Sequence, residues 1–252
     1  MPSITKSRRK RKRRRRREPR SLTTSRTVRL KCWSRRISRA SAKRWVASRA
    51  GRSSISRTRI ANDQGSRMIL IRHGQSEFNA AFNRTGIDPG IIDAPLTEQG
   101  RAQVRRAAEE LRVRIDGGSV IRRLVVSPYT RTLQTAAILA EALDLPMEID
   151  PLVREHALYQ CDIGTPASHL ALAWPALSFG HLTETWWSSL DETRIQLLER
   201  CRSFHHQAGA WTDWREVVVI SHWGFIRGLT GYEARNAELV AFDVTRQPAI
   251  AL

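Results

Sequence analysis

The sequence predicts an α/β fold, a three-layer αβα sandwich with a mostly parallel sheet, over residues 68–252. Short apolar runs typical of buried strands alternate with longer segments of helical spacing, which is the rhythm of βαβ units. In addition, several of the strand-like runs end directly in a turn that contains charged or reactive side chains. Because the carboxyl ends of parallel strands border the ligand crevice of an open sheet, we expect a functional site at these turns.

The first predicted strand, residues 68–71, is followed at once by Arg72-His73-Gly74. Residues 74–96 are rich in Asn, Gly, Asp and Pro and predict a long loop with at most a short helix. Loops of this length are usually functional. Thr97 is then the predicted N-cap of an amphipathic helix over 98–114, which a pair of glycines ends.

A second strand is predicted over residues 121–126, and it also runs into a polar turn, Ser127-Pro128-Tyr129-Thr130-Arg131. Helical spacing resumes over 133–143, and a short strand follows at 147–149. Strand, helix and strand in this order indicate a parallel pair joined by a right-handed crossover.

Residues 151–190 break the rhythm, because they are rich in Pro, Gly and Trp, and we expect an insertion over the crevice. Its tryptophans are more typical of packing than of a base-stacking platform. A helix is predicted over 191–209, followed by the most apolar strand, 216–220, which ends in Ser221-His222. A short helix and a strand over 239–244 complete the domain.

Positive charge is concentrated at one end of the chain. Of the 43 Lys and Arg residues, 25 lie in residues 1–67, together with only two of the 24 acidic residues. Residues 68–252 therefore contain 18 basic and 22 acidic residues and are mildly acidic. The chain's high isoelectric point is a property of the extension, so it does not predict nucleic-acid binding by the domain.

A run of like charges such as residues 8–17 repels itself and predicts a disordered extension. Its composition fits an arm for nucleic acid or anionic lipid, a nuclear-localisation type of patch, or an organellar transit peptide. It does not fit a secretory signal, because no apolar core follows. The alternative is that residues 1–67 have no selected function and that translation starts at Met68.

Three cysteines at distant positions, Cys32, Cys161 and Cys201, argue against a disulfide framework. No cysteine pair or His-Cys cluster has the spacing of a structural zinc site. No apolar run approaches the roughly 18 residues that a membrane span requires. We therefore expect a soluble, cytoplasmic protein without a cofactor, unless the extension directs it to an organelle.

The residues that follow the predicted strands suggest a specific chemistry. Arg72, His73, Arg131 and His222 would converge on one crevice, and Glu155 lies in the loop after the 147–149 strand. Two cations and two imidazoles describe a pocket for a phosphoryl group, and arginines would replace the metal that neutralises its charge elsewhere. Neighbouring arginines would lower the pKa of His73 and keep it a neutral nucleophile.

Several separated motifs occur in order along residues 68–252. They are Arg72-His73-Gly74-x-Ser76-x-x-Asn79, Asn83-Arg84-Thr85-Gly86, Leu96-Thr97-Glu98-Gln99-Gly100, Ser127-Pro128-x-x-Arg131-x-x-Gln134-Thr135-Ala136, Arg154-Glu155 and Ser221-His222-x-Gly224. Taken together, these motifs resemble the histidine phosphatase (phosphoglycerate mutase-like) superfamily across nearly all of residues 68–252.

The resemblance implies a role for each matching residue. His73 would be the phosphorylated nucleophile, and Glu155 the proton donor. The phosphoryl group would be bound by Arg72, Arg131 and His222. The substrate side would be lined by Asn79, Thr85 and Gly86.

The chain departs from the glycolytic mutases in residues 156–190, which do not resemble the lid of those enzymes. A metal-independent phosphatase that hydrolyses a phosphomonoester, most simply a phosphorylated small molecule, is therefore the expected function. One alternative is phosphoryl transfer as in a phosphoglycerate mutase. The other is a nucleic-acid-tethered or scaffolding protein that uses the basic extension.

Overall fold

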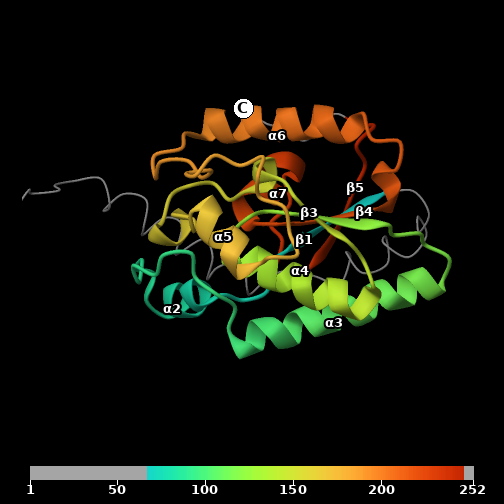
Figure 1. Cartoon of the computed structure of the whole chain (residues 1–252), viewed down its shortest axis with the longest axis horizontal. Helices are drawn as coiled ribbons and strands as arrows, with labels where there is room; N and C mark the ends of the chain where they lie inside the picture. Colours follow the sequence, from blue (N-terminus) through green and yellow to red (C-terminus); the bar gives the residue numbers. More distant parts are fainter. Residues whose placement is uncertain (1–66, 247–252) are drawn as a thin grey trace, which may run out of the picture.

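The computed structural model describes residues 67–246, which form a five-stranded sheet with helices on both of its faces (Figure 1). The strands are β1 Met68–Arg72, β2 Arg123–Val126, β3 Met147–Ile149, β4 Val217–Ser221 and β5 Leu239–Phe242. Each lies within two residues of its predicted range. The predicted extension, residues 1–67, falls outside the described residues except for Arg67.

The strand order is β3-β2-β4-β1-β5. β2, β3, β4 and β1 are parallel, and β5 pairs antiparallel with β1 at one edge. The prediction of a mostly parallel sheet is thus confirmed. The order places β4, which is the fourth strand in the chain, between β2 and β1, and their carboxyl ends lie at the same end of the sheet.

Alternate residues of the strands face opposite sides of the sheet, as the period of two in a pleated strand requires. Val218 and Ile220 of β4 belong to a core cluster with residues of α3 (Glu98–Asp116) and α4 (Thr130–Leu143). Val217 and Val219 belong to a second cluster, with residues of α6 (Arg194–Gly209) and α7 (Trp223–Thr230). Two helical layers enclosing one sheet are the predicted αβα sandwich (Figure 1).

Within the predicted loop 74–96, the structure has a nine-residue helix, α2 (Glu77–Thr85). A capping box starts it: Asn79 N–H donates to Ser76 Oγ, and Ser76 N–H donates to Asn79 Oδ1. Gly86 ends it in the left-handed conformation with a φ of 68°. The helix is therefore specified locally, in a segment whose Gly and Pro content indicated a loop.

The predicted insertion contains only short elements, η1 (Pro151–Val153), η2 (Gln160–Asp162) and α5 (Ala167–Ala173), joined by irregular segments. Trp186 is buried against Tyr129, with ring centroids 4.7 Å apart. Its indole N–H donates to the Thr165 carbonyl at 2.9 Å. This tryptophan therefore packs, as expected. None of the helices in residues 67–246 is long and apolar enough to cross a membrane.

Candidate active site

Three adjacent strands bring the predicted site residues together. The backbone N–H of His73, just past β1, donates to the Ser221 carbonyl at the end of β4, at 3.0 Å. On the other side of β4, the Ser127 N–H donates to the Ile220 carbonyl at 3.2 Å. The rings of His73 and His222 are consequently 5.2 Å apart, edge to face. The strand order places these residues together although about 150 residues separate the two histidines in the chain.

His73 is almost fully buried, and one of its ring nitrogens is occupied. Nδ1 lies 2.7 Å from the Gly74 carbonyl, which can only accept, so Nδ1 donates the proton. Nε2 is then the unprotonated nitrogen, and the structure records no hydrogen bond to it from any residue in 67–246. Burial, followed by the charges of Arg131 and Arg72, holds the pKa of His73 well below its usual value. The ring is thus neutral, has a defined tautomer and keeps a free lone pair on Nε2.

The turn that presents His73 packs tightly against α3. A methyl group on Gly74 would lie 2.6 Å from the Gly100 carbonyl, and one on Gly100 would lie 2.1 Å from the Gln75 carbonyl. Neither space admits a side chain, so both glycines allow the backbones to approach. The Gly74 N–H also donates to Thr135 Oγ1 of α4 at 3.2 Å. His73 is therefore held on a tightly packed turn.

Arg131 lies at the centre of a buried network. Its Nη2 donates to Asp162 Oδ1 at 3.0 Å, its Nη1 to the Cys161 carbonyl at 2.7 Å, and its Nε to His222 Nδ1 at 3.3 Å. His222 Nε2 lies 2.8 Å from Ser127 Oγ. Three bonds engage three of the five guanidinium N–H groups and leave two for a ligand.

Arg72 contains the unsatisfied donor of the site. Its Nη1 donates to the Ala234 carbonyl at 3.0 Å. Its Nε is buried without any hydrogen-bond partner. Every other buried side-chain nitrogen or oxygen in residues 67–246 has one. Burial lowers the pKa of Arg72 to about 10, so the group remains charged at neutral pH. A buried, charged donor without a partner is costly unless an anion occupies the site.

Glu155 follows η1, and its carboxylate is held by backbone donors. Oε1 accepts from the Gly224 N–H at 2.8 Å and from the His156 N–H at 2.9 Å. Burial, reinforced by the nearby charge of Asp162, raises the pKa of Glu155 above its usual value. The raised pKa favours the protonated carboxyl, which is the form that can donate a proton.

Asn79, Thr85 and Gly86 make local contacts in α2. Asn79 caps the helix and also accepts from Asn236 Nδ2 at 3.2 Å, and Asn236 in turn donates to the His73 carbonyl at 3.1 Å. The Thr85 hydroxyl donates to the Ala81 carbonyl of its own helix, and Gly86 is the C-cap. Asn79 is thus linked through Asn236 to the backbone of His73, whereas no hydrogen bond recorded in residues 67–246 links Thr85 or Gly86 to it.

Sequence reasoning did not assign roles to several residues that shape the site. Asp162 is buried and anchors Arg131, and its Oδ2 accepts from the Leu158 and Tyr159 N–H groups. Arg200 and Glu192 form a buried pair beside Glu155. No motif marks these residues, because a lone Asp in an irregular segment or an Arg on a helix is usually solvated.

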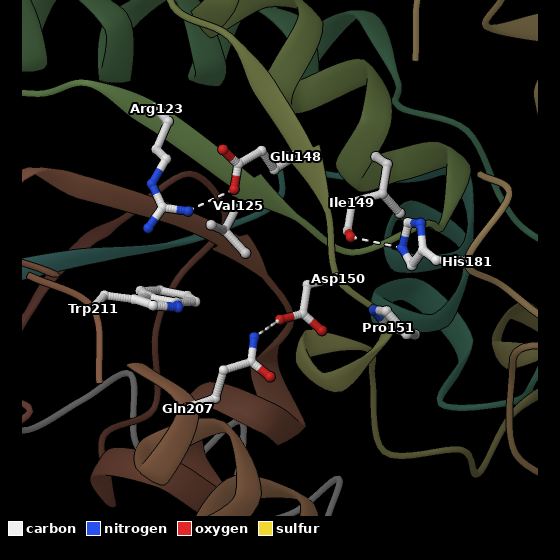
Figure 2. A pocket seen from close by; sticks show the side chains of 9 residues that line it. All are labelled: Arg123, Val125, Glu148, Ile149, Asp150, Pro151, His181, Gln207 and Trp211. Carbon is white, nitrogen blue, oxygen red and sulfur yellow. Dashed lines mark hydrogen bonds and ion pairs between the residues drawn. The ribbon is translucent and has the colours of Figure 1, made fainter. Parts of the chain in front are cut away.

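A cavity of about 310 Å³ lies elsewhere, beside the edge strand β3, and Figure 2 shows its lining. Several of its polar groups already have partners: Arg123 binds Glu148, and Gln207 donates to Asp150 at 2.8 Å. None of the predicted site residues lines it. In residues 67–246, no group of three or more His, Cys, Asp or Glu side chains is arranged to hold a metal ion.

Residues 68–248 match the model of the histidine phosphatase superfamily (branch 1). Glucosyl-3-phosphoglycerate phosphatase of Mycolicibacterium vanbaalenii is 29% identical over 197 residues, which cover 73% of this chain and 78% of that protein. A probable phosphoglycerate mutase GpmB of Yersinia pestis is 41% identical over 88 residues, 35% of this chain and 37% of that one. A solved mycobacterial glucosyl-3-phosphoglycerate phosphatase complexed with VO3 aligns at 24% identity and a TM-score of 0.48, over 69% of this chain and 89% of that one.

The family match extends over nearly all of the described residues, and it includes every motif on which the resemblance rests. The phosphatase names of the longer matches agree with the expected hydrolase. This chain belongs to the histidine phosphatase superfamily.

Proposed function

We propose that residues 68–252 form a metal-independent phosphatase that hydrolyses a phosphomonoester through a phosphohistidine on His73. The observation that supports this most directly is the buried Arg72 Nε without a partner. Arg72 directly precedes His73, which is neutral and has an unprotonated Nε2. A phosphoryl oxygen would satisfy the donor while its phosphorus faces the nucleophile.

In the first step, the Nε2 lone pair of His73 forms an N–P bond as the P–O ester bond breaks. The leaving oxygen takes the proton of Glu155. In the second step, a water molecule gives its proton to Glu155 and its oxygen attacks phosphorus, while the N–P bond breaks and returns the electron pair to His73. Inorganic phosphate leaves, and both residues regain their starting forms.

The negative charge of the transferring group would be stabilised by Arg72, Arg131 and His222. Arg131 retains two free N–H groups after its three bonds, and Asp162 fixes its orientation. His222 Nε2 is bonded to Ser127 Oγ, so a phosphoryl oxygen must share or replace that bond. Preorganised donors of this kind usually contribute more to the rate of such a reaction than any other single effect.

The substrate is proposed to be a phosphorylated small molecule. This rests on the names of the relatives that match along most of the chain, which are glucosyl-3-phosphoglycerate phosphatases at 29% and 28% identity. Phosphorylated sugars and sugar acids are the first compounds to screen. Mutase-type transfer is a second candidate because a probable phosphoglycerate mutase matches over 88 residues. Measuring released phosphate against isomerised product distinguishes the two.

The experiment that tests the function uses the full chain and an aryl phosphate. Activity should persist with a chelator, fall with vanadate and be abolished in His73→Ala. His206→Ala is the matched control, because His206 is an exposed residue of α6. Retention of full activity by His73→Ala would rule out a mechanism that proceeds through a phosphohistidine on His73.

A further inference from the structure

The segment that presents Glu155 has few of the backbone partners that a helix or strand would supply. Residues 154–159 lie between η1 and η2 and belong to no helix or strand. Buried carbonyl and N–H groups of such a segment need other partners. Without them, the position of the Glu155 carboxyl would vary, and acid catalysis is sensitive to that position.

Those partners come from Arg200, on α6. Its Nη1 donates to the carbonyls of Leu152 and Arg154 at 2.9 and 2.7 Å, and its Nη2 donates to the carbonyl of Glu155 itself at 3.0 Å. One guanidinium therefore binds three carbonyls across four residues. Arg200 is only 6% exposed, so little water competes for these bonds.

Glu192 completes the arrangement. Its Oε1 accepts from Arg200 Nε at 3.1 Å, and its Oε2 accepts from Arg200 Nη2 and from the Ala157 N–H at 2.9 and 3.0 Å. Its own carbonyl lies 2.8 Å from His156 Nε2, which donates to it. Glu192 thus neutralises Arg200 and binds the segment on the other side of Glu155.

The same arginine also contacts the helix that binds the carboxylate. The Arg200 guanidinium lies 5.6 Å from the ring centroid of Phe225 on α7, and the preceding residue, Gly224, donates its N–H to Glu155 Oε1. The backbone of Glu155 is therefore held from α6 and its carboxylate from α7. These two helices pack on the same face of the sheet.

We propose that Arg200, together with Glu192, is a positioning residue for acid catalysis by Glu155. The inference rests on the proposed function, because it assigns a role only if Glu155 protonates the leaving oxygen. Lysine cannot replace arginine here, since a single ammonium nitrogen cannot reach three carbonyls and a carboxylate as a planar fork does. Arg200→Lys keeps the charge and loses the geometry.

The test compares kcat/KM for phenyl phosphate and 2,4-dinitrophenyl phosphate in the full chain. Phenolate needs protonation to leave, whereas dinitrophenolate does not. The ratio of the two values measures acid catalysis at the first irreversible step. Because the fraction of folded enzyme cancels in the ratio, a destabilised variant remains informative.

Glu155→Gln should lower the phenyl-to-dinitrophenyl ratio by about 10²-fold or more, the usual contribution of a general acid. Arg200→Lys should lower the ratio by about tenfold. Misplacement of a catalytic group by about 1 Å can cost about 10²-fold, and we expect this substitution to move the Glu155 carboxyl by less than that. Glu192→Gln should also lower this ratio. Arg123→Lys is the matched control, since Arg123 also binds a carboxylate with two nitrogens, in Asp213, but makes no recorded contact with residues 152–157.

An unchanged ratio in Arg200→Lys, with the ratio lowered in Glu155→Gln, would overturn the inference and leave the proposed function intact. An unchanged ratio in Glu155→Gln would instead show that Glu155 is not the acid, and the proposed mechanism would fail at that residue. A lowered ratio in both, with Arg123→Lys unaffected, is the expected result.

Discussion

Arg131 Nε donates a hydrogen bond to His222 Nδ1 at 3.3 Å, and its direction is fixed because a guanidinium has no acceptor. Nδ1 must therefore be unprotonated, so the ring proton lies on Nε2 and is donated to Ser127 Oγ. Burial, with the neighbouring charge of Arg131, holds the pKa of His222 well below its usual value. The folded protein thus contains two adjacent neutral histidines, His222 and His73.

Stability should consequently fall as pH decreases below about 6.5, the usual histidine pKa. Each buried histidine has a lower pKa in the folded state than in the unfolded state, so the unfolded chain takes up protons first. The contribution of each neutral histidine to the free energy of unfolding is complete above about pH 6.5. As pH falls below that value, this contribution decreases by at most about 1.4 kcal/mol per pH unit, until the pKa of the folded state is reached.

Denaturant unfolding of wild type and His222→Asn at several pH values between about 5 and 7.5 measures this contribution. The variant should show the shallower pH dependence, and His206→Asn should follow wild type because His206 is exposed. Taking the difference between proteins removes the opposite contribution of Glu155 and Asp162, whose pKa values are raised by burial. Parallel curves for all three proteins would contradict the prediction.

Glu155→Gln should change the pH profile of kcat/KM as well as its magnitude. In wild type, activity should fall as pH rises through the raised pKa of Glu155, because the carboxyl loses the proton it must donate. The amide cannot titrate, so this limb should disappear. The limb set by His73 should lie below about pH 6.5 in both proteins, because its pKa is lowered. A basic limb that persists in the variant would argue against Glu155.

Gly224→Ala should reduce activity while the protein remains folded. The new methyl group would lie 2.5 Å from Glu155 Oε1, so the carboxylate must move and lose its bond to the backbone N–H. We expect a loss of about 10²-fold in kcat/KM for phenyl phosphate. Gly209→Ala is the control, because its methyl group would meet only Val244, at 4.0 Å. Equal activity of the two variants would show that this contact is unimportant.

Asp162→Asn should be strongly destabilising. It leaves the buried Arg131 guanidinium without its charge partner, and breaking a buried pair costs about 3–5 kcal/mol. Asp213→Asn breaks the more exposed pair with Arg123 and should cost about 1 kcal/mol or less. Phosphate should raise the melting temperature of Asp162→Asn more than that of wild type, since an anion replaces the lost charge. Similar stability of the two variants would refute this prediction.

Much of the architecture was predictable because the decisive signals are local. Apolar runs of three or four residues identified β1, β2 and β4, and each polar turn marked a carboxyl end. The capping box of α2 was also readable, but Gly86 and the prolines that follow it suggested a loop. The predicted positions of His73, Arg131, Glu155 and His222 follow from these strand ends. The roles of Thr85 and Gly86 stay predictions, because their recorded contacts are those of a helix end.

The amino-acid sequence alone was sufficient to identify the αβα class, the family resemblance and the residue types of the site, because these depend on neighbours in the chain. The tertiary structure decided which partner each residue has. It determined that Asp162 anchors Arg131, that Arg200 on α6 holds the backbone of Glu155, and that the proton of His73 lies on Nδ1. Such contacts depend on which strands are adjacent, and the order β3-β2-β4-β1-β5 is settled only when both faces of the sheet are buried.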